Sequence, residues 1–164
     1  MKNIIQSTVF ITMIILSFGT TSCNDMYKGC KNMPDQIIGT GEIIHNAIVW
    51  YSTFDNYNEP KEGQIITSDS LNIFNLVVSF DNRATFIPID FSKYTVLGKY
   101  ADGGCRVVFD RNVTKNIEKK KYTYTITVIE CGTCKELELS MNWVLIPKIE
   151  DDFSVDFLVN YKKN

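Results

Sequence analysis

Two stretches of strictly alternating side chains constrain the fold of this chain more than any other feature. In residues 122–130 the even positions hold Tyr122, Tyr124, Ile126 and Val128, and threonine holds three of the odd positions. In residues 137–145 the odd positions are apolar and the even positions are mostly polar. A period of two is that of a β-strand with one buried face. The sequence therefore predicts two half-buried strands.

The short segment between these stretches predicts that they form a hairpin. It reads Cys131-Gly132-Thr133-Cys134, and Gly followed by any residue is typical of a two-residue type II′ loop. This loop places Val128 opposite Leu137 and Tyr122 opposite Trp143, so that every apolar side chain of one strand meets an apolar one of the other.

A third strand is expected to pair with the other edge of residues 122–130. It covers residues 105–114, with Arg106 opposite Glu130 as an ion pair, and residues 115–121 form the loop. The result is a three-stranded antiparallel meander over residues 104–147.

The rest of the domain is predicted to add strands and one helix. Ser68 is a plausible N-cap for a short helix over about residues 69–79, in which Leu71, Phe74 and Val78 recur at helical spacing. This apolar stripe would cover one face of the sheet. Further strands are expected over residues 42–52, 64–67, about 94–98 and 153–161. The predicted fold class is α+β, a mostly antiparallel β-sheet with one short helix packed on one face.

The N-terminus predicts export. Residues 1–22 combine Lys2, an apolar stretch too short to anchor in a bilayer, and small residues before Cys23, which resembles a bacterial lipoprotein signal peptide. A plain secretory signal is the alternative. Residues 23–40 then form a flexible tether, and residues 41–164 a single α+β domain. Removing the leader leaves 164 − 22 = 142 residues, enough for one domain with a core.

Five cysteines are an odd number for an exported chain, and lipid on Cys23 leaves four. An even number in an oxidising compartment predicts two disulfides. In the meander Cys131 lies between Cys105 and Cys134 on one face, so either could be its partner. Positions that flank a two-residue loop form a hydrogen-bonded pair, whose side chains approach less favourably. We therefore favour Cys105–Cys131 with Cys30–Cys134, and the alternative is Cys131–Cys134 with Cys30–Cys105.

Little in the sequence indicates catalysis. The Cys131/Cys134 pair is an alternative candidate for thiol redox chemistry, but it lies between strands with Glu130 and Glu136 beside it, and negative neighbours raise a thiol pKa. His45 is the single histidine, and no catalytic set or metal site forms around it. The net charge of −2 shows no basic excess for nucleic acid. We expect no enzyme activity, no cofactor, no metal and no nucleic-acid partner.

Several short runs occur in an order that resembles the PrcB-like family of small bacterial envelope subunits. The runs are IDFSKYTVLG (89–98), GGC (103–105), the 122–128 strand, VLIPK (144–148) and VDF (155–157). The resemblance covers about residues 64–160. It implies association with a surface protease complex that the protein stabilises or regulates without cleaving anything, and it transfers no catalytic residue.

These observations predict a cell-envelope lipoprotein, anchored to a bacterial membrane through Cys23, with the outer membrane favoured. Its expected role is to bind a protein partner, with a protease as the candidate. A small-ligand or glycan-binding module is the alternative if Trp50, Tyr51, Phe54 and Tyr57 line a groove. A thiol redox protein that uses Cys131 and Cys134 is the third hypothesis.

Overall fold

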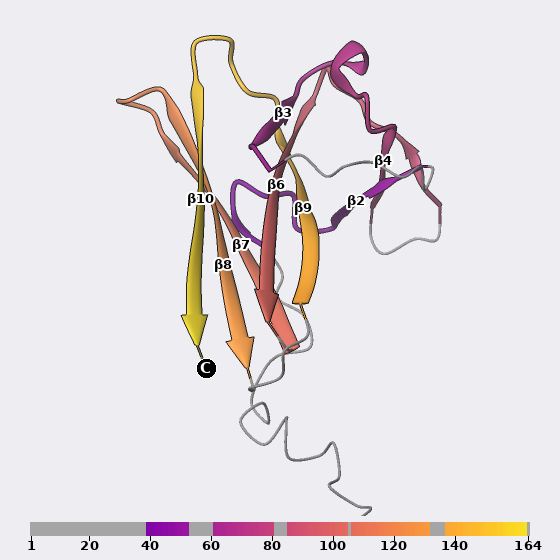
Figure 1. The fold of residues 1–164 in the computed structure, drawn as a ribbon. Coiled ribbons are helices and arrows are strands. Elements are labelled where there is room, and N and C mark those ends of the chain that lie inside the picture. Colours follow the sequence, from indigo (N-terminus) through magenta and orange to yellow (C-terminus); the bar gives the residue numbers. More distant parts are fainter. Residues whose placement is uncertain (1–38, 53–60, 81–84, 105, 132–136, 164) are drawn as a thin grey trace, which may run out of the picture.

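The computed structural model describes residues 39–52, 61–80, 85–104, 106–131 and 137–163, and these form three β-sheets (Figure 1). The strands are β1 (Thr40–Gly41), β2 (Ala47–Tyr51), β3 (Gln64–Ile66), β4 (Leu76–Phe80), β5 (Ile87–Pro88), β6 (Tyr94–Gly104), β7 (Arg106–Asn116), β8 (Lys121–Cys131), β9 (Leu137–Pro147) and β10 (Ser154–Lys163). The large sheet has the order β1-β7-β8-β10, the middle sheet β3-β6-β9 and the small sheet β2-β4-β5.

The middle sheet lies between the other two, and its central residues are therefore buried on both faces. Leu97 and Val96 are adjacent in β6, both 0% exposed, and point to opposite sides. The side chains of β9 also point to both sides of the sheet: Ile146 points toward the large sheet and Trp143 toward the small sheet. We call the two resulting clusters the large-sheet core and the small-sheet core.

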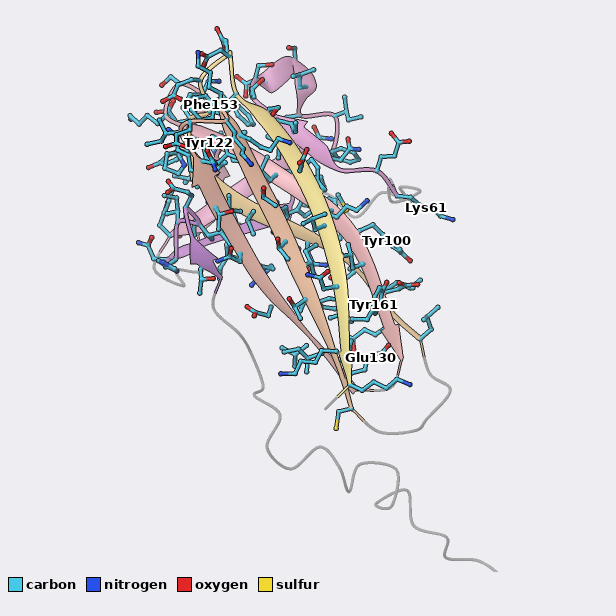
Figure 2. The ribbon with its side chains drawn as sticks, turned by 90° about the vertical axis from the view of Figure 1, so that its left-hand side faces the viewer. Lys61, Tyr100, Tyr122, Glu130, Phe153 and Tyr161 are labelled. Atoms are coloured by element: carbon cyan, nitrogen blue, oxygen red, sulfur yellow. The ribbon has the colours of Figure 1, made fainter. Side chains whose placement is uncertain are left out.

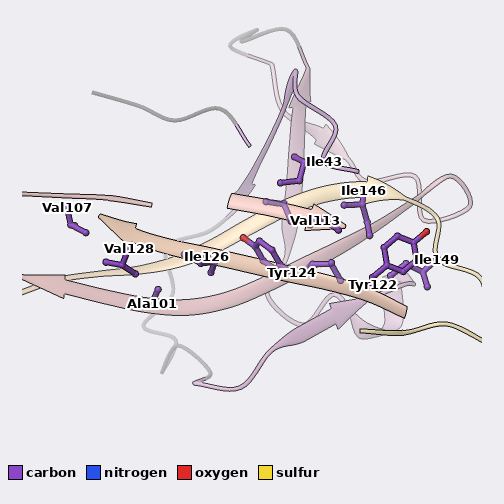
Figure 3. Packing of buried hydrophobic residues seen from close by; sticks show 12 residues of the cluster. Ile43, Ala101, Val107, Val113, Tyr122, Tyr124, Ile126, Val128, Ile146 and Ile149 are labelled. Atoms are coloured by element: carbon purple, nitrogen blue, oxygen red, sulfur yellow. The ribbon is translucent and has the colours of Figure 1, made fainter. Parts of the chain in front are cut away.

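β8 has the alternation that the sequence predicts. Tyr122, Tyr124, Ile126 and Val128 are at most 2% exposed and point into the large-sheet core (Figure 3). The Tyr124 hydroxyl donates a hydrogen bond to the backbone oxygen of Asn142 in the middle sheet, at 3.0 Å. Burial raises the pKa of Tyr124, so its hydroxyl stays a neutral donor between the two layers.

β10 confirms the predicted final strand and pairs with β8 in parallel. Ten consecutive positions are in register, from Ser154 opposite Lys121 to Lys163 opposite Glu130. The chain reaches this position after passing through β9 in the middle sheet, and parallel neighbours require such a crossover. The side of β10 that faces inward adds apolar side chains to the large-sheet core, namely Val155, Phe157 and Val159.

The predicted hairpin between residues 122–130 and 137–145 is wrong. β9 pairs with β6 along eleven positions, and β8 pairs with β7 and β10 instead. The cause is the apolar run 143–146, which supplies buried side chains to both faces and suits a strand covered on both sides. β8 is apolar on one face only and suits an outer sheet. The predicted loop, residues 132–134, lies outside the described residues.

The predicted pairing of β7 with β8 is correct in direction and wrong by one residue in register. Arg106 lies opposite Cys131, rather than opposite Glu130. The turn between the strands covers residues 117–120 and is shorter than the predicted loop at 115–121. A one-residue slip exchanges the faces of a strand, and the burial of Val113 opposite Tyr124 shows which face of β7 points inward.

The predicted α+β class, with a helix over about residues 69–79, is also wrong, because the fold is nearly all β. Within that range the structure has a 3-10 helix, Asp69–Leu71, without a side-chain cap from Ser68. The Asn72 side chain then binds the backbone amide and carbonyl of Leu76, at 2.8 and 3.0 Å, and Asn75 has a φ of 49°. This turn directs the chain into β4, whose β-branched residues favour a strand.

The segment from Gly39 to Ile44 closes one side of the space between the large and middle sheets. β1 pairs with β7, the Glu42 amide donates to the Val113 oxygen at 2.8 Å, and the Ile44 amide donates to the Leu145 oxygen at 2.9 Å. The predicted strand over residues 42–52 is therefore shorter, because a turn at residues 45–46 precedes β2.

Gly41 makes this closure possible. Its φ is +75°, and a Cβ at this position would collide with the Val113 carbonyl oxygen. We expect Gly41→Ala to lower the free energy of unfolding by about 2 kcal/mol, measured by urea denaturation, because alanine is strained at positive φ. The exposed neighbour Thr40, which accepts one hydrogen bond from Asn112, provides the control: Thr40→Ala should cost less than about 1 kcal/mol. Equal losses in the two variants would contradict this role.

Candidate functional site

Cys131 is the one predicted site residue among those that the structure describes. It ends β8, is 2% exposed and is disulfide-bonded. Cys23, Cys30, Cys105 and Cys134 lie outside the described residues, so lipidation and the disulfide pairing stay predictions.

The surroundings of Cys131 are apolar. It clusters with Val108 and Ile129 on the outward side of the large sheet. In the observed register Arg106 lies directly opposite Cys131, so the predicted opposition of two cysteines no longer favours one bridge over its alternative. A sulfur buried in this way has little access to a substrate disulfide.

Two further sets of residues that could take part in polar chemistry lie at the surface of the described part of the chain. His45 is exposed in the turn before β2. The acidic residues 150–152 lie in the exposed turn before β10, where Glu150 binds Lys115 and Asp152 binds Lys120. Among the described residues, no group of three or more His, Cys, Asp or Glu side chains could hold a metal ion, and no helix is long and apolar enough to span a membrane.

The outward side of the small sheet carries a row of exposed apolar side chains. Trp50 lies opposite Val77, which lies opposite Pro88, and Ile48 is two residues from Trp50 on the same strand face. Trp50 is 48% exposed and Ile48 40%. Phe86, two residues before Pro88, is 43% exposed. We call these five residues the apolar face; none of them carries a charge.

The inward side of the small sheet holds the apolar face in position. Tyr51 follows Trp50 in β2 and points inward, where its ring meets the edge of the Trp143 ring at 6.2 Å. The Phe74 ring packs on the Trp143 ring, with 5.2 Å between their centroids. The Trp143 ring also lies over Gly98, where any Cβ would collide with it. This packing fixes β2 and β4 against the middle sheet.

This packing bears on the predicted groove of Trp50, Tyr51, Phe54 and Tyr57. Trp50 and Tyr51 point to opposite sides of β2, so they do not line one surface. Phe54 and Tyr57 lie outside the described residues. Trp50 is thus the one member of the predicted set that the structure places on an exposed surface. Sequence patterning did not single out Ile48 and Phe86, although the continuous apolar run 47–51 was a signal for a strand with two apolar faces.

Polar contacts close the opposite side of the molecule, where β10 meets β6 (Figure 2). The Tyr161 hydroxyl donates to Asp102 Oδ1 at 2.7 Å, and the Gly104 amide donates to Glu130 Oε1 at 2.9 Å. The hydrogen bond to Asp102 raises the pKa of Tyr161 to about 12, with smaller contributions from burial and from the charge of Glu130. The first contact joins the lower end of β10 to the middle sheet, and the second joins β8 to it.

A second group of contacts holds the upper end of β10. Lys115 Nζ lies over two aromatic rings, 5.4 Å from the centroid of Tyr122 and 4.7 Å from that of Phe153. It also forms an ion pair with Glu150 Oε1 at 3.2 Å. Tyr122 and Glu150 raise the pKa of Lys115, so its charge is retained. β10 is therefore fixed at both ends by side chains, and along its length by β8.

Comparison with protein-family models, curated proteins and solved structures finds no match to this chain. The PrcB-like resemblance therefore stays a prediction from short runs of sequence. Within the described residues, the apolar face carries large exposed apolar side chains and no charged one.

The Tyr161–Asp102 hydrogen bond predicts a shifted titration. The neutral phenol is the favoured form in the folded chain, so the stability that this bond contributes is present below pH 10 and is lost as the pH rises toward about 12. We expect the tyrosinate absorbance that Tyr161→Phe removes to have a midpoint near pH 12, read in rapid pH jumps before the chain unfolds. Asp102→Asn should lower that midpoint. A midpoint near 10 in the unsubstituted chain would contradict the contact.

Proposed function

We propose that this chain is a non-enzymatic lipoprotein of the bacterial cell envelope that binds another protein through the apolar face. The observation that carries the proposal is the exposure of Trp50 and Ile48 on one face of β2 at the outer surface of the small sheet, together with the exposed Phe86 just before β5. Water-exposed apolar side chains of this size, gathered without charges, favour contact with a protein surface. Tryptophan and phenylalanine are also enriched at the centres of protein interfaces.

The geometry of the face supports a preformed docking surface. Trp143, Phe74 and Tyr51 support β2 and β4 from behind, so that the outward side chains start from a fixed backbone. A partner would lose little free energy in ordering such a surface on binding. The chemistry of the face selects a partner that presents apolar or aromatic side chains, because a charged group would lose its hydration there without gaining a counter-charge.

The identity of the partner and the place of the chain in the cell come from the sequence. The PrcB-like runs support a surface protease as the partner, which this chain would stabilise or regulate. The leader over residues 1–22 and the small residues before Cys23 support a lipid anchor on that cysteine. The anchor would hold the apolar face near other envelope proteins and raise the effective concentration of the two partners.

The docking surface is tested by photocrosslinking in the native host. With a photoreactive phenylalanine analogue in place of Ile48, we expect the full chain to crosslink to one protein, identified by mass spectrometry as a protease subunit. Trp50→Asp should reduce that product by about tenfold or more, because it places a charge in an apolar contact. Ile117→Asp is the matched control, since Ile117 is also an exposed apolar residue but lies at the β7–β8 turn.

Two outcomes of this experiment contradict different parts of the proposal. A crosslinked product that persists at full yield with Trp50→Asp would exclude the apolar face as the docking surface. A crosslinked partner that belongs to no protease would exclude the protease assignment and leave the face as a docking surface for another protein. A thermal melt of each variant verifies that the folded domain is retained, which the exposure of both substituted side chains leads us to expect.

The lipid anchor is tested separately. We expect Cys23→Ser to abolish incorporation of labelled fatty acid and to remove the chain from the membrane fraction. Cys30→Ser changes another thiol of the same segment and should retain both properties. Mass spectrometry of the protein from membranes reports the lipid directly, and an unlipidated Cys23 in the mature chain would refute the anchor.

A further inference from the structure

The outer edge of β10 is a long strand edge without a partner strand among the described residues. β10 runs over residues 154–163 and pairs on one side only, with β8. Figure 1 shows it as the end strand of the large sheet, with no further strand of that sheet beyond it. Its register with β8 has no bulge, and its sequence has no proline. Bulges and prolines are two of the usual features that prevent a strand edge from pairing with another chain.

The other long edges of the two sandwiched sheets are interrupted. β1 covers the edge of β7 at residues 112–113, and the Ile44 amide binds the edge of β9 at the Leu145 oxygen. Along residues 155–163 of β10, no backbone hydrogen bond to another described segment is present apart from the ladder with β8. The free edge of β10 is therefore the longest uninterrupted one among the described strands.

We propose that β10 is the contact of a homodimer, in which the β10 strands of two copies pair antiparallel about a two-fold axis at Val159. The axis is perpendicular to the sheet, so the outward face of one copy continues as the outward face of the other. Such pairing keeps residues of the same face opposite each other. The two four-stranded large sheets become one continuous sheet of eight strands.

The charges on the outward face select this register. Asp156 and Lys162 lie on the same face but about 20 Å apart along the strand, too far to pair within one copy. With the axis at Val159, Asp156 of each copy lies opposite Lys162 of the other, which gives two symmetric ion pairs. Moving the axis to Leu158 or to Asn160 removes both pairs, because Asp156 then faces an asparagine.

The side chains on the inward face of β10 also favour the register about Val159. Phe157 of each copy lies opposite Tyr161 of the other, and aromatic residues are favourable cross-strand neighbours. The hydrogen bond from Tyr161 to Asp102 holds the tyrosine beside β6, and the Phe157 ring packs on the large-sheet core and on Tyr124. Both side chains are thus held in place before the second copy arrives.

The dimer does not depend on the proposed protein partner. β10 belongs to the large sheet, whereas the apolar face lies on the small sheet, on the other side of the middle layer. Two-fold pairing through β10 leaves both apolar faces exposed. Loss of the partner with Trp50→Asp and loss of the dimer through β10 are therefore separate results.

Charge reversal tests the contact and its register in the full chain, by sedimentation equilibrium in density-matched detergent. We expect a monomer–dimer equilibrium. Lys162→Asp alone and Asp156→Lys alone should each weaken the dimer by about tenfold, because each places two like-charge pairs across the axis. The double variant Asp156→Lys/Lys162→Asp should restore the dimer to within about threefold of the unsubstituted chain.

The design separates the contact from damage to the fold. Asp156 also binds Lys121 at 2.8 Å, and both Asp156→Lys and the double variant lose that pair, so recovery from Asp156→Lys to the double variant cannot come from within one copy. Lys163→Asp makes the same change of charge one residue away on the opposite face and should leave the dimer unchanged. Thermal melts of all variants verify folding.

Three outcomes would overturn the proposal. A chain that stays monomeric at every concentration excludes the dimer. A dimer that is insensitive to all charge reversals excludes β10 as the contact. A double variant that is as weak as the single variants excludes the antiparallel register about Val159.

Discussion

The ladder between β6 and β9 is the contact on which the other layers depend. Its eleven paired positions form the centre of the middle sheet. The buried residues of this ladder include Val96–Gly98 in β6 and Met141–Ile146 in β9, and they cover both faces of the sheet. Burial of apolar area is the main favourable term in folding, and this ladder supplies one wall to each of the two cores. Without it, the inward faces of β8 and of the small sheet would have no apolar surface to cover them.

Polar contacts join the layers of this sandwich, both between the sheets and at their sides. The Tyr124–Asn142 and Tyr161–Asp102 hydrogen bonds join the large sheet to the middle sheet, and backbone bonds from Glu42 and Ile44 do so on the other side. Each such group exchanges water for a partner in the protein, so its burial is not penalised. Two surfaces stand apart from this closure, the apolar face on the small sheet and the free edge of β10. Both are carried by strands that pack against the two cores.

Sequence patterning located most of the strands but not their neighbours. The alternation of residues 122–128 and of 153–161 predicts β8 and β10 correctly, and residues 64–67 and 94–98 fall within or around β3 and β6. The hairpin between β8 and β9 was wrong because matching apolar faces occur in both strands, and cross-strand matching cannot distinguish a sequential neighbour from a distant one. The helix was wrong because Leu71, Phe74 and Val78 also fit a turn followed by a strand. Of the candidate docking residues, Trp50 was noticed in the sequence, but its exposure depends on packing around Tyr51 and Trp143.

The sequence by itself determined that the segments with a clear period of two, such as residues 122–128 and 153–161, are extended and which of their faces is buried, because that period is a local property of the backbone. It also supplied the prediction of a leader, the cysteine count and the net charge of −2. Only the tertiary structure decided that β9 joins β6, that β10 lies parallel to β8, and that Trp50 faces water while Tyr51 faces the core. These choices depend on which surfaces meet in space, and no local period specifies the partner of a strand whose two faces are both apolar.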